Sequence, residues 1–360
     1  MCRLKNHLKT LIQLNGPIKV STYMHIALQD PKDGYYQTKL PFGQKGDFIT
    51  APEISQLFGE IIGVFLLKNW QSQKPKAPLS LAEIGPGRGT LMQDILRTIK
   101  TLDPNTFANM QAFLLETSPR LIAEQKTCLA PFGEKVQWMN DFAQLPPVPL
   151  QLVANELFDA LAIDQYIKIK DQWFERLIGL SDEGNFCFCL SPAHLPVVND
   201  ANALATLPSE TILEISPIRQ QLMEKISLHI MQQGGTAVLI DYGEYHTKSQ
   251  RATGDTLQAL SHHKPQDIFV APGVHDLTSH VDFTSLCAIA QQTGCRTKLL
   301  QQGDFLIKMG LLERAGALGH GKSIKVQNQI SSAVERLAAP SQMGALFKVL
   351  IISQTTIAPL

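Results

Sequence analysis

Three glycines at alternate positions, Gly85, Gly87 and Gly89, are the residues best suited to bring a backbone close to a ligand. An apolar run precedes them at 79–84, and apolar residues at helical spacing follow them at 90–96. A strand, a glycine turn and a helix in this order expose backbone N–H groups at the start of the helix. The pattern therefore predicts a turn that binds a nucleotide or a related ligand.

The glycine spacing separates two classes of ligand. A dinucleotide-binding turn has the pattern G-x-G-x-x-G, which would place a glycine where this chain has Thr90. An acid before the first glycine, here Glu83, followed by G-x-G-x-G instead resembles the first motif of S-adenosylmethionine (AdoMet) methyltransferases. A purely structural tight turn is the alternative for such a glycine pattern.

Polar residues at the ends of further apolar runs supply the rest of a site, because an open α/β sheet binds ligands at the carboxyl ends of its strands. Glu116 ends the second run and is placed to accept both hydroxyls of a ribose. Asp141 follows the third run and can contact an adenine amino group, cap a helix, or do both. Asn155 and Glu156 follow the fourth run and are the candidates for contact with the reacting centre.

Three other acids, Asp47, Glu53 and Asp159, lie outside these strand ends or one helical turn beyond them. Helix capping accounts for the residues around Glu53, but it does not account for the loop of Gly46 and Asp47 just before them. Asp159, one helical turn beyond Glu156, is expected to offset the dipole of a helix rather than to act directly.

The elements that must position these residues alternate between strand and helix. Expected strands cover 79–84, 111–116, 135–139, 150–155 and 236–241. This alternation predicts an α/β fold with a mostly parallel, doubly wound sheet. The expected units are a helical and loop extension at 1–78, a core at 79–310 with a β-hairpin insert at 163–206 and a lid insert at 243–281, and a helical segment at 311–360.

Composition limits the partners and the compartment. The 32 basic side chains equal the 32 acidic ones, so binding to nucleic acid or to an anionic membrane has no support from net charge. No apolar run reaches the ~18 residues of a membrane helix, and the N-terminus has no secretory or organelle presequence. The scattered cysteines fit a reduced compartment. We therefore expect a soluble, cytoplasmic protein without membrane insertion.

Two further patterns are weak. Residues 316–323 match the phosphate-loop pattern, but no buried strand precedes them and no later strand ends in a magnesium-binding aspartate. Four histidines, at 262, 263, 275 and 280, lack the spacing of metal ligands, so no metal site is expected.

Several long motifs together resemble the MidA family, class I AdoMet-dependent methyltransferases that include a mitochondrial complex I assembly factor methylating protein arginine. The matching segments are 17–36, 46–55, 83–92, 155–161, 254–258, 281–283 and 340–348. Ala162 departs from the family, which often has proline there. The missing presequence suggests a bacterial protein.

The resemblance implies a Rossmann-like class I methyltransferase with AdoMet as cofactor and S-adenosylhomocysteine as product. The implied cofactor-binding residues are Gly46, Glu83, Gly85, Pro86, Gly87, Arg88, Gly89, Thr90, Glu116, Asp141 and Asn155. The implied catalytic residues are Glu156, Asn155, Asp47 and Glu53.

The implied reaction is symmetric arginine dimethylation of a protein, a respiratory complex I subunit or its bacterial equivalent. A homodimer is compatible with the sequence. Two alternatives stay open: AdoMet-dependent methylation of a small molecule or nucleic acid, and a non-catalytic AdoMet-binding assembly factor.

Overall fold

The computed structural model describes residues 3–38, 50–73, 76–193, 195, 204, 206–246, 254–261 and 264–355. Within these residues, the largest sheet has the strand order β15-β16-β10-β5-β2-β3-β4, with β14 beside the end of β10. The strands are β2 (Ser80–Ile84), β3 (Gln111–Leu115), β4 (Val136–Met139), β5 (Leu150–Asn155), β10 (Gly235–Glu244), β14 (Val281–Asp282), β15 (Arg296–Gln301) and β16 (Phe347–Ser353).

The five predicted strands are all present and form the parallel part of this sheet, β10-β5-β2-β3-β4. The order reverses beside β2, so that the chain winds outward in both directions from the strand that leads into the glycine turn. The predicted doubly wound α/β fold is therefore confirmed, and its switch point lies where the candidate site residues are expected.

The C-terminal segment differs from the helical expectation. Strand β16 runs antiparallel between β10 and β15, pairing residues 347–353 with residues 236–242. Its residues Val349 to Ile352 form one apolar run with no exposed side chain. A strand buried on both faces shows no alternation of apolar and polar residues, so periodicity does not distinguish it from a buried helix.

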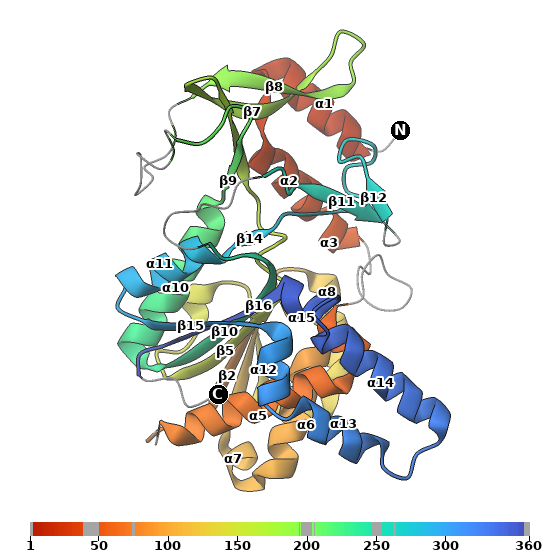
Figure 1. Ribbon diagram of the computed structural model, residues 1–360, viewed down its shortest axis with the longest axis vertical. Helices are drawn as coiled ribbons and strands as arrows, with labels where there is room; N and C mark the ends of the chain where they lie inside the picture. Colours follow the sequence, from red (N-terminus) through yellow and green to blue (C-terminus); the bar gives the residue numbers. More distant parts are fainter. Residues whose placement is uncertain are drawn as a thin grey trace.

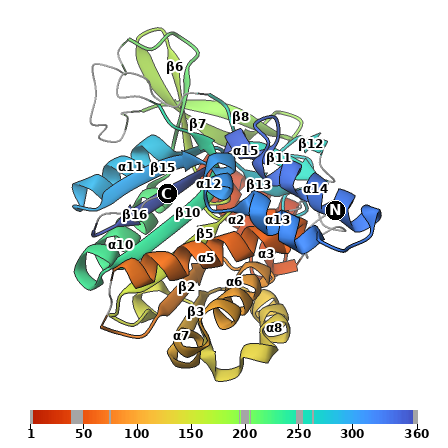
Figure 2. The same cartoon turned by 60° about the horizontal axis from the view of Figure 1, so that its bottom comes forward.

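Helices cover both faces of the sheet (Figures 1 and 2). On one face lie α5 (Gln56–Ser72), α6 (Thr90–Leu102), α12 (Gln302–Lys308) and α13 (Leu311–Gly319), and on the other α10 (Pro217–Gln233) and α11 (Phe283–Gln292). Helices α5 and α6 approach closely, because a Cβ at Gly63 would lie 3.2 Å from the Cα of Ile95.

The remaining helices are short or peripheral. They are α4 (Ala51–Ile54), α7 (Pro104–Asn109), α8 (Pro119–Cys128), η1 (Ala130–Lys135), η2 (Phe142–Gln144), α14 (Ile324–Ala338) and α15 (Met343–Leu346). The phosphate-loop match begins inside α13, which follows helix α12 instead of a strand. Its context therefore differs from that of a nucleotide-binding loop.

The first residues and both inserts combine into a cap above the sheet (Figure 1). The cap consists of α1 (Arg3–Asn15), β1 (Ile18–Lys19), α2 (Val20–Gln29), α3 (Tyr35–Thr38), β6 (Asp164–Ile169), β7 (Gln172–Leu180), β8 (Phe186–Pro192), β9 (Ile212–Ile215), β11 (Gln258–Ser261), β12 (Lys264–Gln266) and β13 (Asp276–Thr278).

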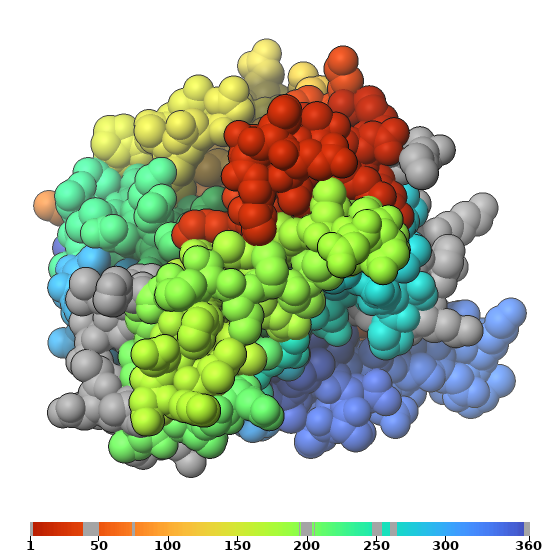
Figure 3. All heavy atoms as spheres, turned by 90° about the horizontal axis from the view of Figure 1, so that it is seen from above, coloured from red at the N-terminus to blue at the C-terminus, as the bar shows by residue number. Residues whose placement is uncertain are grey.

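One apolar core holds the cap together. It joins Leu8 and Tyr23 from the first helices, Ile178 and Phe186 from the hairpin insert, and Leu277 from the second insert. Figure 3 shows these three parts of the chain side by side when the molecule is viewed from above. Segments that the sequence presents as separate additions thus pack as one unit over the carboxyl ends of the strands. None of the described helices has the length and apolar character needed to cross a membrane.

We expect Ile351→Ala to lower the free energy of unfolding by about 2–5 kcal/mol, because it opens a cavity in the middle of the sheet. Leu14→Ala, at a side chain 78% exposed, is the control and should change stability by less than about 0.5 kcal/mol. Urea unfolding followed by circular dichroism measures both. A small effect of Ile351→Ala would contradict a central position for β16.

Candidate active site

The glycine turn joins β2 to α6 in a conformation that side chains rarely adopt. Gly85, Gly87 and Gly89 have φ angles of 67°, 54° and 84°. The Gly85 N–H donates to the carbonyl of Leu115 at the end of β3, 3.1 Å away. A Cβ at Gly85 would lie 2.8 Å from a methyl group of Leu157. The backbone conformation therefore favours glycine at this position, and a side chain there would also require Leu157 to shift.

Gln125 of α8 links three parts of the site, a role that the sequence did not suggest. Its side-chain amide donates to the carbonyl of Gly87 (2.7 Å) and to the carboxylate of Glu116 (3.2 Å). Its amide oxygen accepts a hydrogen bond from the indole of Trp138. The residue is fully buried. A lone glutamine in an amphipathic helix carries no sequence signal for such a position.

Glu53 belongs to the glycine turn in this structure. Its carboxylate accepts a hydrogen bond from the Thr90 hydroxyl (2.5 Å) through one oxygen and from Arg88 (3.2 Å) through the other. Glu83, in β2 below the turn, is buried, and burial raises its pKa to about 8. Glu53 therefore supports the turn through Thr90 and Arg88.

Two cavities meet at the turn. The larger, of about 500 Å³, is lined by the glycine turn, Glu116, Asp141 and residues of α10. The smaller, of about 40 Å³, is lined by Thr50, Glu53, Glu83, Pro86, Arg88, Thr90, Asn155 and others. Gly85, Gly87 and Glu156 line both cavities. A bipartite ligand lying across the turn would therefore pass beside Glu156.

Glu116 and Asp141 occupy the larger cavity from the ends of β3 and β4. Glu116 accepts the backbone N–H groups of Thr117 and Ser118, each at 2.8 Å, and burial raises its pKa. Asp141 caps the short helix η2 through the N–H of Ala143 (2.9 Å) while it also lines the cavity. The capping role and the cavity-lining role thus coexist.

Glu156 follows β5 with a φ angle of 49°, a strained conformation for a residue with a side chain. One carboxylate oxygen accepts the backbone N–H of Ala51 (2.9 Å) and the side-chain amide of Asn155 (3.2 Å). Burial raises the pKa of Glu156 to about 7. The Oδ1 atom of Asn155 is buried without a partner, as expected of a group that awaits a ligand donor.

One expectation from the sequence is not tested by the structure, and another is contradicted by it. Gly46 and Asp47 lie outside the described residues, so their roles stay predictions. Asp159 begins no helix, because the chain after β5 forms turns instead. The expectation that it offsets a helix dipole is therefore wrong.

No three histidine, cysteine or acidic side chains among the described residues form a group able to hold a metal ion. His262 and His263 fall outside those residues.

The sheet order and the glycine turn at its switch point are those of a class I AdoMet-dependent methyltransferase. The larger cavity has a volume within the usual range for ligand sites. Residues 61–300 match the family model described as S-adenosyl-L-methionine-dependent methyltransferase. The chain belongs to this methyltransferase family.

Curated relatives agree over almost the whole chain. A Danio rerio protein with the name "Protein arginine methyltransferase NDUFAF7, mitochondrial" is 31% identical to this chain. The match covers 97% of this chain and 86% of that protein. Its Drosophila melanogaster homolog is 33% identical over 96% of this chain and 84% of its own. The human protein of the same name is 31% identical over 95% of this chain and 81% of its own length.

Solved structures show the same fold. A protein from Burkholderia thailandensis bound to S-adenosyl-homocysteine has a TM-score of 0.81 at 24% identity and covers 97% of this chain and 91% of its own. A native structure from the same organism has a TM-score of 0.82 at 25% identity, with the same coverage.

The expectation of a cytoplasmic, bacterial protein is wrong, because the curated relatives carry mitochondrial names.

We expect Gly85→Ala to weaken AdoMet binding by about tenfold or more, because the new methyl group meets Leu157 and strains the turn. Gly184→Ala is the matched control, since Gly184 has a φ angle of 73° with open space around it. The control should lose similar stability and keep its AdoMet affinity. Calorimetric titration distinguishes the two, and equal losses of affinity would contradict the assigned site.

Proposed function

We propose that this protein is a protein arginine N-methyltransferase in which Glu156 is the catalytic carboxylate. The observation that carries the proposal is the position of Glu156 at the junction of the two cavities. The names of the curated relatives support arginine as the methylated residue. The reaction class itself follows from the family.

Bound AdoMet supplies a methyl group that its sulfonium already activates. The chain must hold the acceptor in line and exclude water. A guanidinium has a pKa above about 12, so its nitrogen lone pair is poorly available. Glu156 can pair with one edge of the guanidinium and take its proton as the nitrogen–methyl bond forms and the sulfur–methyl bond breaks.

The roles proposed for the other residues follow from where they lie. Glu116 would bind the ribose, Asp141 the adenine, and the glycine turn with Arg88 and Thr90 the methionyl end. Glu53 stabilises the turn through Thr90 and Arg88, so we propose a positioning role for it in place of catalysis.

For the acceptor, we propose symmetric dimethylation of a respiratory complex I subunit, as the family resemblance implies. A small-molecule or nucleic-acid acceptor and a non-catalytic assembly role are outcomes of the test below.

The test is transfer of labelled methyl from AdoMet into an extract of cells that lack this protein, followed by hydrolysis. We expect symmetric dimethylarginine with the natural protein. Label in a metabolite or RNA would overturn the acceptor, and AdoMet binding without any transfer would overturn the enzymatic role.

We expect Glu156→Gln to reduce transfer by at least ~10²-fold, the usual contribution of a positioned acid or base. Its affinity for S-adenosylhomocysteine should stay within about twofold of the natural value. A parallel loss of transfer and binding would show that Glu156 holds the cofactor or the fold instead.

The charge of Glu156 should also change the relative affinities for AdoMet and S-adenosylhomocysteine. Above a pH of about 7 its carboxylate is ionised and attracts the sulfonium, so AdoMet should bind more tightly than neutral S-adenosylhomocysteine. The preference should decline as the pH falls through this value, because protonation removes the charge. Titrations at several pH values measure it, and Glu156→Gln should show no such change. An identical pH dependence in both proteins would contradict the assignment.

A further inference from the structure

Gln125 of α8 is a fully buried polar side chain to which the proposed function gives no role. Burying an amide is costly unless its donors and its acceptor all find partners. The partners of Gln125 lie in the glycine turn, at the end of β3 and in β4. Gln125 therefore fixes three elements relative to one another, and two of its partners, Gly87 and Glu116, line the larger cavity.

Trp138 determines the orientation of the Gln125 amide. An indole nitrogen can only donate a hydrogen bond, so the Gln125 atom that lies 2.9 Å from it is the amide oxygen. The amide nitrogen then faces the Gly87 carbonyl (2.7 Å) and the Oε2 atom of Glu116 (3.2 Å). A flipped amide would place an oxygen against these two acceptors, so only one orientation serves all three partners.

This orientation determines which part of Glu116 is left for a ligand. A carboxylate has about four acceptor positions. The Oε1 atom of Glu116 accepts the backbone N–H groups of Thr117 and Ser118, each at 2.8 Å. In the described part of the chain, the Oε2 atom accepts only from Gln125. The capacity that remains for a ribose hydroxyl therefore lies mainly on the oxygen that Gln125 holds.

Helix α8 lies directly against the glycine turn. A Cβ at Gly89 would be 3.5 Å from the Cγ and 3.6 Å from the Cα of Gln125, which is ordinary van der Waals contact. Ser118, which caps α8, is also one of the residues that donate to Glu116. The turn, the helix and the carboxylate thus pack together, and Gln125 supplies the hydrogen bonds that connect the turn to the carboxylate.

We propose that Gln125 is a positioning residue for the cofactor, which aims the Oε2 atom of Glu116 at the ribose and keeps it aligned with the glycine turn. Gln125 itself lines neither cavity, so it acts through Glu116 and Gly87. The inference rests on the proposed ribose-binding role of Glu116 and deepens it. Binding of the ribose hydroxyls is therefore the property that Gln125 controls.

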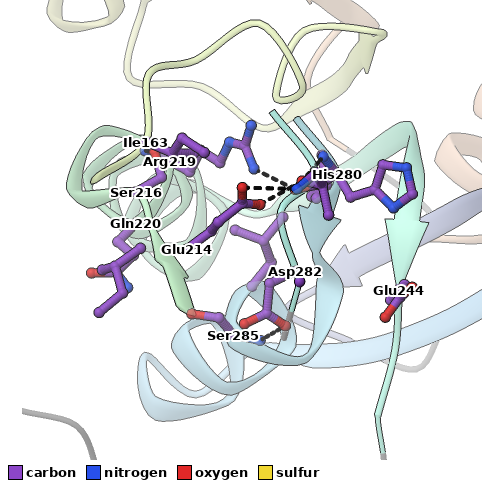
Figure 4. Close-up of a pocket in the computed structure, with 14 residues that line it drawn as sticks. Ile163, Glu214, Ser216, Arg219, Gln220, Glu244, His280, Asp282 and Ser285 are labelled. Carbon is purple, nitrogen blue, oxygen red and sulfur yellow. Dashed lines mark hydrogen bonds between the residues drawn. The ribbon is translucent and has the colours of Figure 1, made fainter. Parts of the chain in front are cut away.

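The cap contains a second glutamine with the same chemistry. Gln165 of β6 is also fully buried, and its amide donates to Glu214 (2.8 Å) and Asp255 (2.9 Å) and accepts from Arg176 (3.2 Å). Glu214 lines the separate pocket of about 60 Å³ that Figure 4 shows. Gln165 and these partners line neither cavity of the active site. Gln165→Met is therefore a matched control for the loss of a buried amide.

The test compares, by calorimetric titration, the affinities for S-adenosylhomocysteine and for its analogue whose ribose lacks both hydroxyl groups. The natural protein should prefer S-adenosylhomocysteine, because only this ligand can donate from its ribose to Glu116. Gln125→Met keeps the length of the side chain and removes its hydrogen bonds, so the ratio of the two affinities should fall about tenfold or more. Gln165→Met should lower Tm by a similar amount and leave the ratio unchanged.

Gln125→Glu is the second variant, and it serves if Gln125→Met does not fold. It keeps the size of the side chain and the acceptor for Trp138, but an ionised carboxylate cannot donate to Gly87 or Glu116. The same fall in the ratio is expected.

Equal losses of affinity for the two ligands in the Gln125 variants would show a general structural role and overturn the proposal, and so would unchanged affinities. A natural protein that binds both ligands equally would instead contradict the ribose-binding role of Glu116, and the proposal would fall with it. None of these results bears on arginine methylation, which the labelled-methyl assay tests separately.

Discussion

The site depends on a buried turn at the end of β5 that places the Glu156 carboxyl group beside the glycine turn. Glu156 adopts a left-handed backbone conformation there, and Asp241 fixes the following residues through their N–H groups. Both features cost stability, so the surrounding structure must enforce them. The result is that the Glu156 carboxyl group is held where the two cavities meet, and under the proposed function it pairs there with a cationic acceptor.

The cap helps to hold the turn after β5 in place. The Arg219 guanidinium connects the turn to the second insert through carbonyl groups of both. The backbone N–H of Ala51, the first residue of α4, donates to the Glu156 carboxylate. Because the cap has its own apolar core, residues far apart in the chain reach the site as one packed unit. The sheet supplies the cofactor site, and the cap completes the place where chemistry occurs.

Sequence reasoning succeeded where signals were local. The glycine turn, the five parallel strands and the polar residues at their ends could be read from short patterns, because each pattern reflects one element. It failed where a role arises only from packing. Strand β16 lacks alternation because both its faces are buried, and Gln125 has no motif. The turn after β5 is held by Asp241 and Arg219, which are distant from it in sequence. The cap could not be recognised because no single segment of it has a core.

The most direct test of this account is a crystal structure of the protein with S-adenosylhomocysteine. We predict adenosine in the larger cavity with its ribose on Glu116, the amino-acid end in the smaller cavity, and the sulfur within about 5 Å of the Glu156 carboxylate, close enough for an in-line acceptor. A ligand whose sulfur lies more than about 10 Å from Glu156, or whose ribose avoids Glu116, would contradict the account.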